Sequence, residues 1–215
     1  MAHPNENEAF LHVLKRRRTS RGFLDRPLPP GAMELILEAG RWAPSAANTQ
    51  PWEILVIDDK KVQEELKEAY LQESLLHDRH YQKVSNKQAE LITAPVLLGV
   101  CGEPRTEERY IDASEIPPRY REELFLLTMG AFIQNLLLMA AQLGLGSTWI
   151  ARLARIPEVA EILGLPEWIR PISFVALGFG LRDAFFDEGL RIPIERKTHH
   201  NRFGRPYPAS EGSTW

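Results

Sequence analysis

The chain has little cysteine, and it lacks the motifs of several common enzyme classes. Its single cysteine, Cys101, excludes an intramolecular disulfide and argues against a cysteine-ligated zinc or iron–sulfur site. Gly178-Phe179-Gly180 lacks the third glycine of a dinucleotide-binding fingerprint. A phosphate-binding Gly-Lys-Ser/Thr loop and a Gly-x-Ser-x-Gly nucleophile turn are also missing. We therefore expect neither a Rossmann domain, a P-loop NTPase nor an α/β-hydrolase.

Excess charge of either sign is also missing. The formal net charge is −3, so nothing attracts nucleic acid in general, and the basic cluster at 15–21 is a local feature. The first eight residues are polar and acidic and lack the apolar core of a secretion signal. With one cysteine, this composition predicts a cytoplasmic protein with no nucleic-acid partner.

The chain has 215 residues, 44% of them hydrophobic, which suits a single domain over 1–215. Apolar periodicity predicts the order of its helices and strands. Helical spacing before the arginines and before Pro44 predicts two helices, and a charged helical stretch follows near 61–90. A short helix is expected at 157–163. Apolar runs predict strands at 53–57, 95–101, 146–150 and 172–179.

The segment 124–143 is apolar on nearly every face, so it needs apolar surroundings on all sides. Its length would also allow a membrane span, but four polar residues and Gly130 favour a core or dimer helix. The preceding segment, 102–121, is charged, proline-containing and aperiodic, which predicts a lid. From about residue 190 to 215 the chain is rich in proline, arginine and aromatics, as expected of an extended arm lying over a partner.

Two segments together suggest a pocket for an anionic, planar ligand. The first is Lys15-Arg16-Arg17-Arg18-Thr19-Ser20-Arg21, whose forked guanidinium donors suit a phosphate. The second runs from Ala43 to Trp52, where Ser45, Asn48 and Gln50 offer donors and acceptors and the small Ala46 leaves room for a ring. Each segment alone has an ordinary explanation, as a solvated basic helix end and as a polar connector.

These segments, with Gly144-Leu145-Gly146-Ser147-Thr148-Trp149-Ile150 and the basic tail Arg196-Lys197-Thr198, resemble the nitroreductase family in order and spacing. The resemblance implies an α+β fold with a central mixed β-sheet flanked by helices, in an intertwined homodimer. It further implies FMN as cofactor, NAD(P)H as hydride donor, and a nitroaromatic, quinone or other conjugated molecule as acceptor. The flavin performs the redox step, so we expect no catalytic protein residue and no metal.

The same resemblance assigns roles to particular residues. Arg17 and Thr19 would reach the FMN phosphate with Arg18 as an ancillary contact, while Arg21 would lie near the pyrimidine edge and stabilise negative charge on the reduced flavin. The turn from the opposite subunit would meet the ring edge and ribityl oxygens through Pro44, Ser45, Ala46, Asn48 and Gln50. A backbone N–H of Trp149 or Ile150 would face flavin N5, and Arg196 and Lys197 would complete the phosphate site.

Three alternatives to this function remain open from the sequence. The same fold also hosts flavin fragmentation and reductive dehalogenation, which the lid would distinguish. A chain that binds FMN without catalysis is a further alternative, and a nucleic-acid module using the basic cluster is a weaker one.

Overall fold

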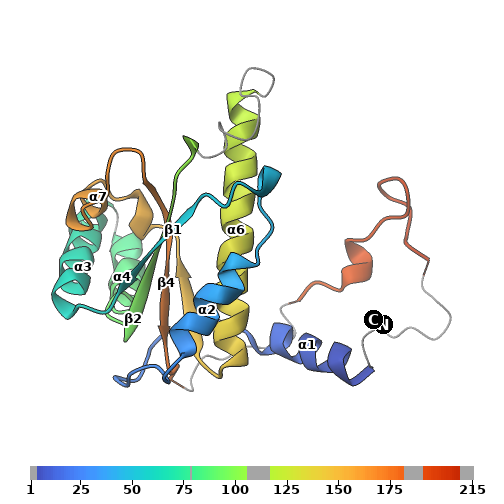
Figure 1. The fold of residues 1–215 in the computed structure, drawn as a ribbon, viewed down its shortest axis with the longest axis horizontal. Coiled ribbons are helices and arrows are strands. Elements are labelled where there is room, and N and C mark those ends of the chain that lie inside the picture. The colour runs from blue at the N-terminus through green and yellow to red at the C-terminus, as the bar shows by residue number, and fades with distance from the viewer. Residues whose placement is uncertain (1–3, 78, 106–116, 182–190, 209–215) are drawn as a thin grey trace. The chain divides into compact units, whose positions relative to one another are not determined.

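A four-stranded sheet forms the centre of the fold (Figure 1). The computed structural model describes residues 4–77, 79–105, 117–181 and 191–208, and every strand belongs to the first of its two units, 1–184. The strands follow the spatial order β1-β2-β4-β3. Their bounds are β1 (Trp52–Ile57), β2 (Val96–Gly102), β3 (Gly146–Ile150) and β4 (Arg170–Gly178). All four predicted strands are confirmed.

Neighbouring strands of this sheet all run antiparallel, whereas a mixed sheet was predicted. Among the described residues, the one parallel pairing is the isolated bridge between Thr19 and Ser147 at the outer edge of β3. The α+β class is confirmed, and the sheet is mixed only through this bridge. The difference arises because short apolar runs identify strands without stating their direction.

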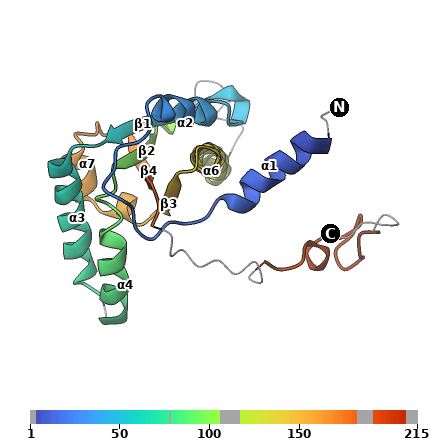
Figure 2. The same cartoon turned by 90° about the horizontal axis from the view of Figure 1, so that it is seen from below.

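Helices cover both faces of the sheet (Figure 2). One face carries α2 (Ala32–Arg41) and α6 (Pro118–Gln142), and the other carries α3 (Lys60–Ser74), α4 (Arg79–Ala89) and α7 (Glu158–Ile162). In β4, Val175 and Leu177 join the core under α2 and α6, while Phe174 and Ala176 join the opposite core. This alternation is the period of two expected of a strand buried on both faces.

The helix α6 begins six residues before the predicted helix at 124–143, so the last part of the predicted lid is helical. Pro118 stands at its start, where a missing N–H costs nothing because that group has no partner within the helix. At the other end Gly144 adopts φ 75°, and the N–H of Leu145 donates to Ala140 O at 2.9 Å, as in a Schellman cap. The lid residues 106–116 lie outside the described residues.

By length and composition α6 could cross a membrane, but half of its most apolar window is buried inside the protein. Phe132 stacks on Trp52 of β1 with ring centroids 4.8 Å apart, and a Cβ added to Gly40 of α2 would lie 2.7 Å from the Phe132 ring. This close approach explains the glycine in α2. The packing is that of a core helix, as the sequence predicted.

Cys101 lies on β2 and is completely buried. Burial raises the pKa of its thiol to about 12, and the nearby Glu53 carboxylate acts in the same direction. The cysteine is therefore a small, buried core residue.

The remaining elements are α1 (Pro4–Arg16) and three short 3-10 helices, η1 (Ala46–Asn48), η2 (Leu153–Arg155) and η4 (Ile194–Arg196). The last belongs to the second unit, 185–215, which contains the predicted arm. That the two units form a single domain stays a prediction.

Candidate functional site

The basic segment after α1 is fixed against the outer edge of β3. Ser20 is buried, its N–H donates to Ser147 O at 2.9 Å, and its carbonyl accepts from Thr148 Oγ1. Further along, the N–H of Leu24 donates to Phe179 O at 2.8 Å. The predicted phosphate segment and the predicted glycine segment, far apart in sequence, therefore form one structural site.

Gly146 is required for this contact. A Cβ at position 146 would overlap Ser20 Oγ and would also lie 3.0 Å from Gly180 Cα. A Cβ at Gly180 would come within 2.7 Å of the same hydroxyl. Two glycines thus let the serine backbone pack directly on the strand, which sets the position of the arginines on either side.

The arginines of this segment do not all have the same role. Arg17 and Arg18 are half-buried, and Arg18 Nη1 donates to Arg17 O at 3.1 Å, whereas Arg21 is exposed. Arg16 Nη2 donates to Ala141 O at 2.9 Å, at the carbonyl end of α6. A cation there stabilises the helix dipole, so Arg16 joins α1 to α6. No motif or spacing in the sequence indicated this structural role.

The edge of β3 identifies which backbone N–H faces outward. Ser147 O accepts from Ser20, so the backbone groups of Ser147 point away from β4. Backbone direction alternates along an antiparallel strand, so the N–H of Trp149 points to the same open edge and that of Ile150 points to β4. The Ile150 side chain is buried, whereas that of Trp149 is 44% exposed. Of the two predicted donors, Trp149 has the suitable geometry.

The turn between α2 and β1 holds unusual backbone conformations. Ala47, Asn48 and Gln50 have φ values of 48°, 56° and 47°, in the left-handed region. The Gln50 N–H donates to Ser45 Oγ at 3.2 Å, and the Gln50 amide donates to Asn48 Oδ1 at 3.2 Å. Left-handed residues other than glycine cost free energy and persist where the surroundings enforce them, often at ligand sites.

This turn is anchored to α6 far from the basic segment. The N–H of Ala46 donates to Thr128 Oγ1 at 3.2 Å, while the basic segment reaches α6 through Arg16 at Ala141. Those two helix positions are separated by about 20 Å at a rise of 1.5 Å per residue. Pro44, Asn48 and Gln50 are exposed, and Ser45 and Ala46 are half-buried. Within one chain the two segments predicted to bind FMN are therefore attached to α6 at widely separated positions.

The two basic residues of the tail, Arg196 and Lys197, belong to the second unit. Their backbone N–H groups close the short helix η4 by donating to Pro193 O and Ile194 O. Their part in the phosphate site stays a prediction.

Two cavities adjoin the basic segment and the end of β3. One, of about 410 Å³, is lined by Gly22, Phe23, Lys60 and neighbours. The other, of about 380 Å³, is lined by Ala151, Arg155, Arg170 and neighbours. Neither of these two cavities is lined by the arginines at 17–21 or by the 44–50 turn.

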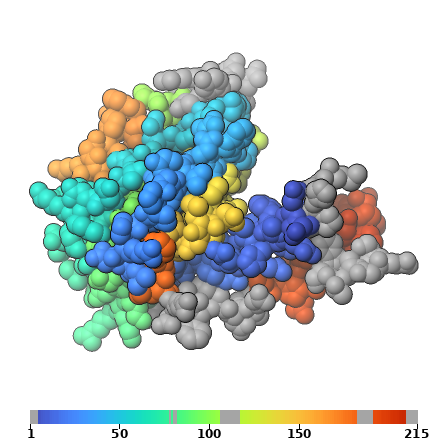
Figure 3. All heavy atoms as spheres, turned by 60° about the horizontal axis from the view of Figure 1, so that its bottom comes forward, coloured from blue at the N-terminus to red at the C-terminus, as the bar shows by residue number. Residues whose placement is uncertain are grey.

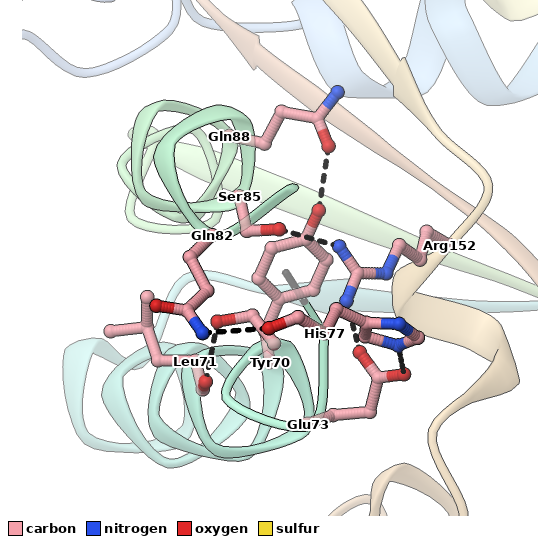
Figure 4. A network of polar contacts seen from close by, with 9 residues as sticks. Tyr70, Leu71, Glu73, His77, Gln82, Ser85, Gln88 and Arg152 are labelled. Carbon is pink, nitrogen blue, oxygen red and sulfur yellow. Dashed lines mark hydrogen bonds and ion pairs between the residues drawn. The ribbon is translucent and has the colours of Figure 1, made fainter. Parts of the chain in front are cut away.

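A polar cluster lies beside the end of β3 (Figure 4). Arg152 follows the strand by two residues, and its guanidinium donates to Ser85 Oγ at 2.6 Å and to Glu73 Oε2. The same guanidinium lies 4.8 Å from the ring centroid of Tyr70. Glu73 also contacts His77 Nε2 at 3.0 Å. The contact with His77, and to a lesser extent that with Arg152, lowers the pKa of the Glu73 carboxyl below its ordinary value. Sequence reasoning missed this cluster.

Comparison with known proteins decides the family. The Nitroreductase family model matches residues 14–179. The chain belongs to the nitroreductase family. A Thermus thermophilus relative named NADH dehydrogenase is 32% identical, over 88% of this chain and 97% of its own. An Archaeoglobus fulgidus relative with the provisional name NADH dehydrogenase/NAD(P)H nitroreductase is 30% identical, over 80% and 86%.

A solved Bacteroides fragilis nitroreductase with bound FMN has a similar fold. The TM-score is 0.65 at 26% identity, covering 83% of this chain and 92% of that one. The family predicted from the four segments is confirmed, and the matched range includes three of them, all but the tail.

The Glu73 cluster generates a pH-dependent prediction. Because the folded-state pKa of Glu73 is lowered, its carboxylate stabilises the fold above the unfolded-state pKa of about 4.3, and this stabilisation is lost as the pH falls further. Glu73→Gln should therefore cost about 1–2 kcal/mol at pH 7 and progressively less toward pH 3. Urea unfolding at both pH values measures the difference. Glu158→Gln, at an exposed position on α7, is the control, and an equal loss at both pH values would contradict the assignment.

Proposed function

We propose that this member of the nitroreductase family is an FMN-dependent oxidoreductase that takes hydride from NAD(P)H and reduces a nitroaromatic, quinone or related conjugated acceptor. The observation that carries this proposal is the joining of the arginine segment to the open edge of β3. A single ligand at this edge can contact both the arginine segment, which suits a phosphate, and an outward backbone N–H. The FMN bound to the Bacteroides fragilis nitroreductase and the name of the Thermus relative support the same chemistry.

The residues fit FMN in two respects. Arg17, Arg18 and Arg21 supply cations for a phosphate of about two negative charges, and they precede or follow a buried serine that fixes their backbone. Trp149 supplies a backbone donor directed away from the sheet, as a ring nitrogen requires. We infer that Arg17, Arg18 and Thr19 hold the phosphate and that Arg21 lies toward the pyrimidine edge. Bound FMN would supply hydride acceptance and electron transfer, and the chain supplies position and charge.

We further infer a homodimer in which the turn at 44–50 of one chain completes the site of the other. The turn and the basic segment lie too far apart along α6 to enclose one ring within a chain. Leu126 and Leu127 of α6 are 46% and 71% exposed, and Figure 3 shows part of α6 (yellow) uncovered between α2 and α1. A second chain would cover this apolar surface. The single, inert cysteine agrees with a cytoplasmic location.

The proposed reaction is tested by anaerobic bleaching. The purified chain should carry a yellow chromophore that NADH or NADPH bleaches, and that a nitroaromatic or quinone restores. Absorbance near the oxidised-flavin band follows both steps. Bound FMN without bleaching would instead support a flavin-binding protein. Bleaching without reoxidation by either acceptor would favour a specialised flavin reaction.

Arg17→Ala should weaken FMN binding by roughly ten- to a hundredfold, because it removes about 1.5–3 kcal/mol of charged hydrogen bonding to the phosphate. Ser45→Ala should weaken it less, since a neutral hydroxyl contributes less. Fluorescence titration of the apoprotein measures both. Lys61→Ala, at an exposed cation on α3, is the control. Equal affinity in Arg17→Ala and the wild type rejects the phosphate assignment.

Leu127→Glu should shift the protein from a dimer toward a monomer of 24.5 kDa and should lower its FMN content. The reason is that a charge at the centre of an apolar interface must be desolvated without a partner. Light scattering with flavin absorbance measures both quantities. Leu76→Glu is the matched control, because Leu76 is 82% exposed at the end of α3. A folded wild-type monomer with full FMN content would exclude the shared site.

A further inference from the structure

We infer that Arg152 is a positioning residue for the hydride-accepting end of the site: it clamps the end of β3 to the α3–α4 pair and so holds the Trp149 N–H in place. This inference rests on the proposed function, because it assigns a purpose to an N–H that faces the flavin only if FMN binds there.

The two halves of β3 are held differently. At its start, Ser147 is bonded on one edge to Ser20 and the strand is paired on the other edge with β4. At its end, Trp149 and Ile150 are paired with Val175 and Phe174 of β4, and the described residues provide no strand on the outer edge. A strand held on one edge alone frays more readily. The outward N–H of Trp149 lies in this weaker half.

Arg152 supplies the missing restraint from the next turn of chain. Figure 4 shows its side chain reaching between the two helices, with Ser85 of α4 on one side and Glu73 of α3 on the other. Its side chain is 21% exposed and that of Glu73 is 29% exposed, so water screens the ion pair only in part. The planar guanidinium contacts Ser85, Glu73 and the Tyr70 ring together, which a lysine ammonium cannot match.

The partners of Arg152 are themselves fixed. Tyr70 is completely buried, and its hydroxyl donates to Gln88 Oε1 of α4 at 2.6 Å, which ties the ring to both helices. The Gln82 side chain donates to His77 O at 2.8 Å, closing the connection between α3 and α4. Ile150 and Leu153, on either side of the arginine, are buried in the same core as Tyr70. The clamp therefore joins the strand end to a rigid support.

The chain offers a matched control for this clamp. Lys67 is also a cation between the two helices, with its side chain 18% exposed and its Nζ 3.2 Å from Glu90 Oε1. It differs in its partners, because its ion pairs are with Glu64 and Glu90, neither of which belongs to β3 or η2. Lys67→Gln should weaken the contact between α3 and α4 without increasing the mobility of the end of β3. Arg152→Gln should weaken that contact and also make the strand end more mobile.

The first experiment is hydrogen–deuterium exchange of the FMN-free protein, read on peptides that cover 149–155. Arg152→Gln should increase exchange there by about tenfold, and Lys67→Gln should leave it unchanged. Arg152→Lys keeps the positive charge and should recover part of the protection from exchange. This rescue keeps the test decisive if Arg152→Gln fails to fold. Unchanged exchange in Arg152→Gln, or equal exchange in the two glutamine variants, overturns the clamp.

The second experiment follows flavin bleaching by NADH in stopped flow with FMN-saturated protein. Arg152→Gln should slow hydride uptake by about tenfold while changing the FMN dissociation constant less than about threefold, since the phosphate contacts are remote from it. Equal rates in the variant and the wild type overturn the positioning role. A wild-type chain that binds no FMN overturns the proposed function, and the exchange result still decides whether Arg152 holds the strand.

Discussion

The packing of Ser20 on β3 is the contact on which the proposed site depends. It uses the buried serine backbone, the Thr148 hydroxyl and the space left by Gly146. The contact joins a segment at the end of the first helix to a strand more than a hundred residues later. Because the arginines flank Ser20 directly, their backbone positions follow from it. A larger residue at 146 would move the arginines away from the outward N–H of Trp149. A single ligand could then no longer contact both groups.

Local sequence was sufficient for the four strands, whereas the binding roles of the arginine segment stay predictions. Apolar runs identified the four strands, and the family resemblance pointed to the segment 144–150, whose Gly146 is explained by its close approach to Ser20. The start of α6 and the direction of the strands were less well predicted. A proline such as Pro118 is common both in loops and at the first position of a helix, so the start of α6 was not determined by it. Strand direction depends on contacts between distant segments, which apolar runs do not reveal.

The residues that sequence reasoning missed all act across long separations. Arg16 belongs to a basic run and gave no sign that it binds the carbonyl end of α6. Arg152 is one of several arginines after an apolar strand, and its partners Glu73 and Ser85 are spread over two charged helices. No spacing rule connects such positions. By contrast, alternation along β3 directs the N–H of Trp149 outward and that of Ile150 into the sheet, which favours Trp149 as the predicted donor.

The buried thiol of Cys101 has a consequence for the proposed reduction of nitroaromatics and quinones. The products and intermediates of such reactions include electrophiles that attack thiolates. This chain has one cysteine, enclosed in β2 with a pKa near 12, so at neutral pH it presents almost no thiolate to react. Under the proposed function, reactive products would therefore find almost no sulfur nucleophile on this chain to alkylate.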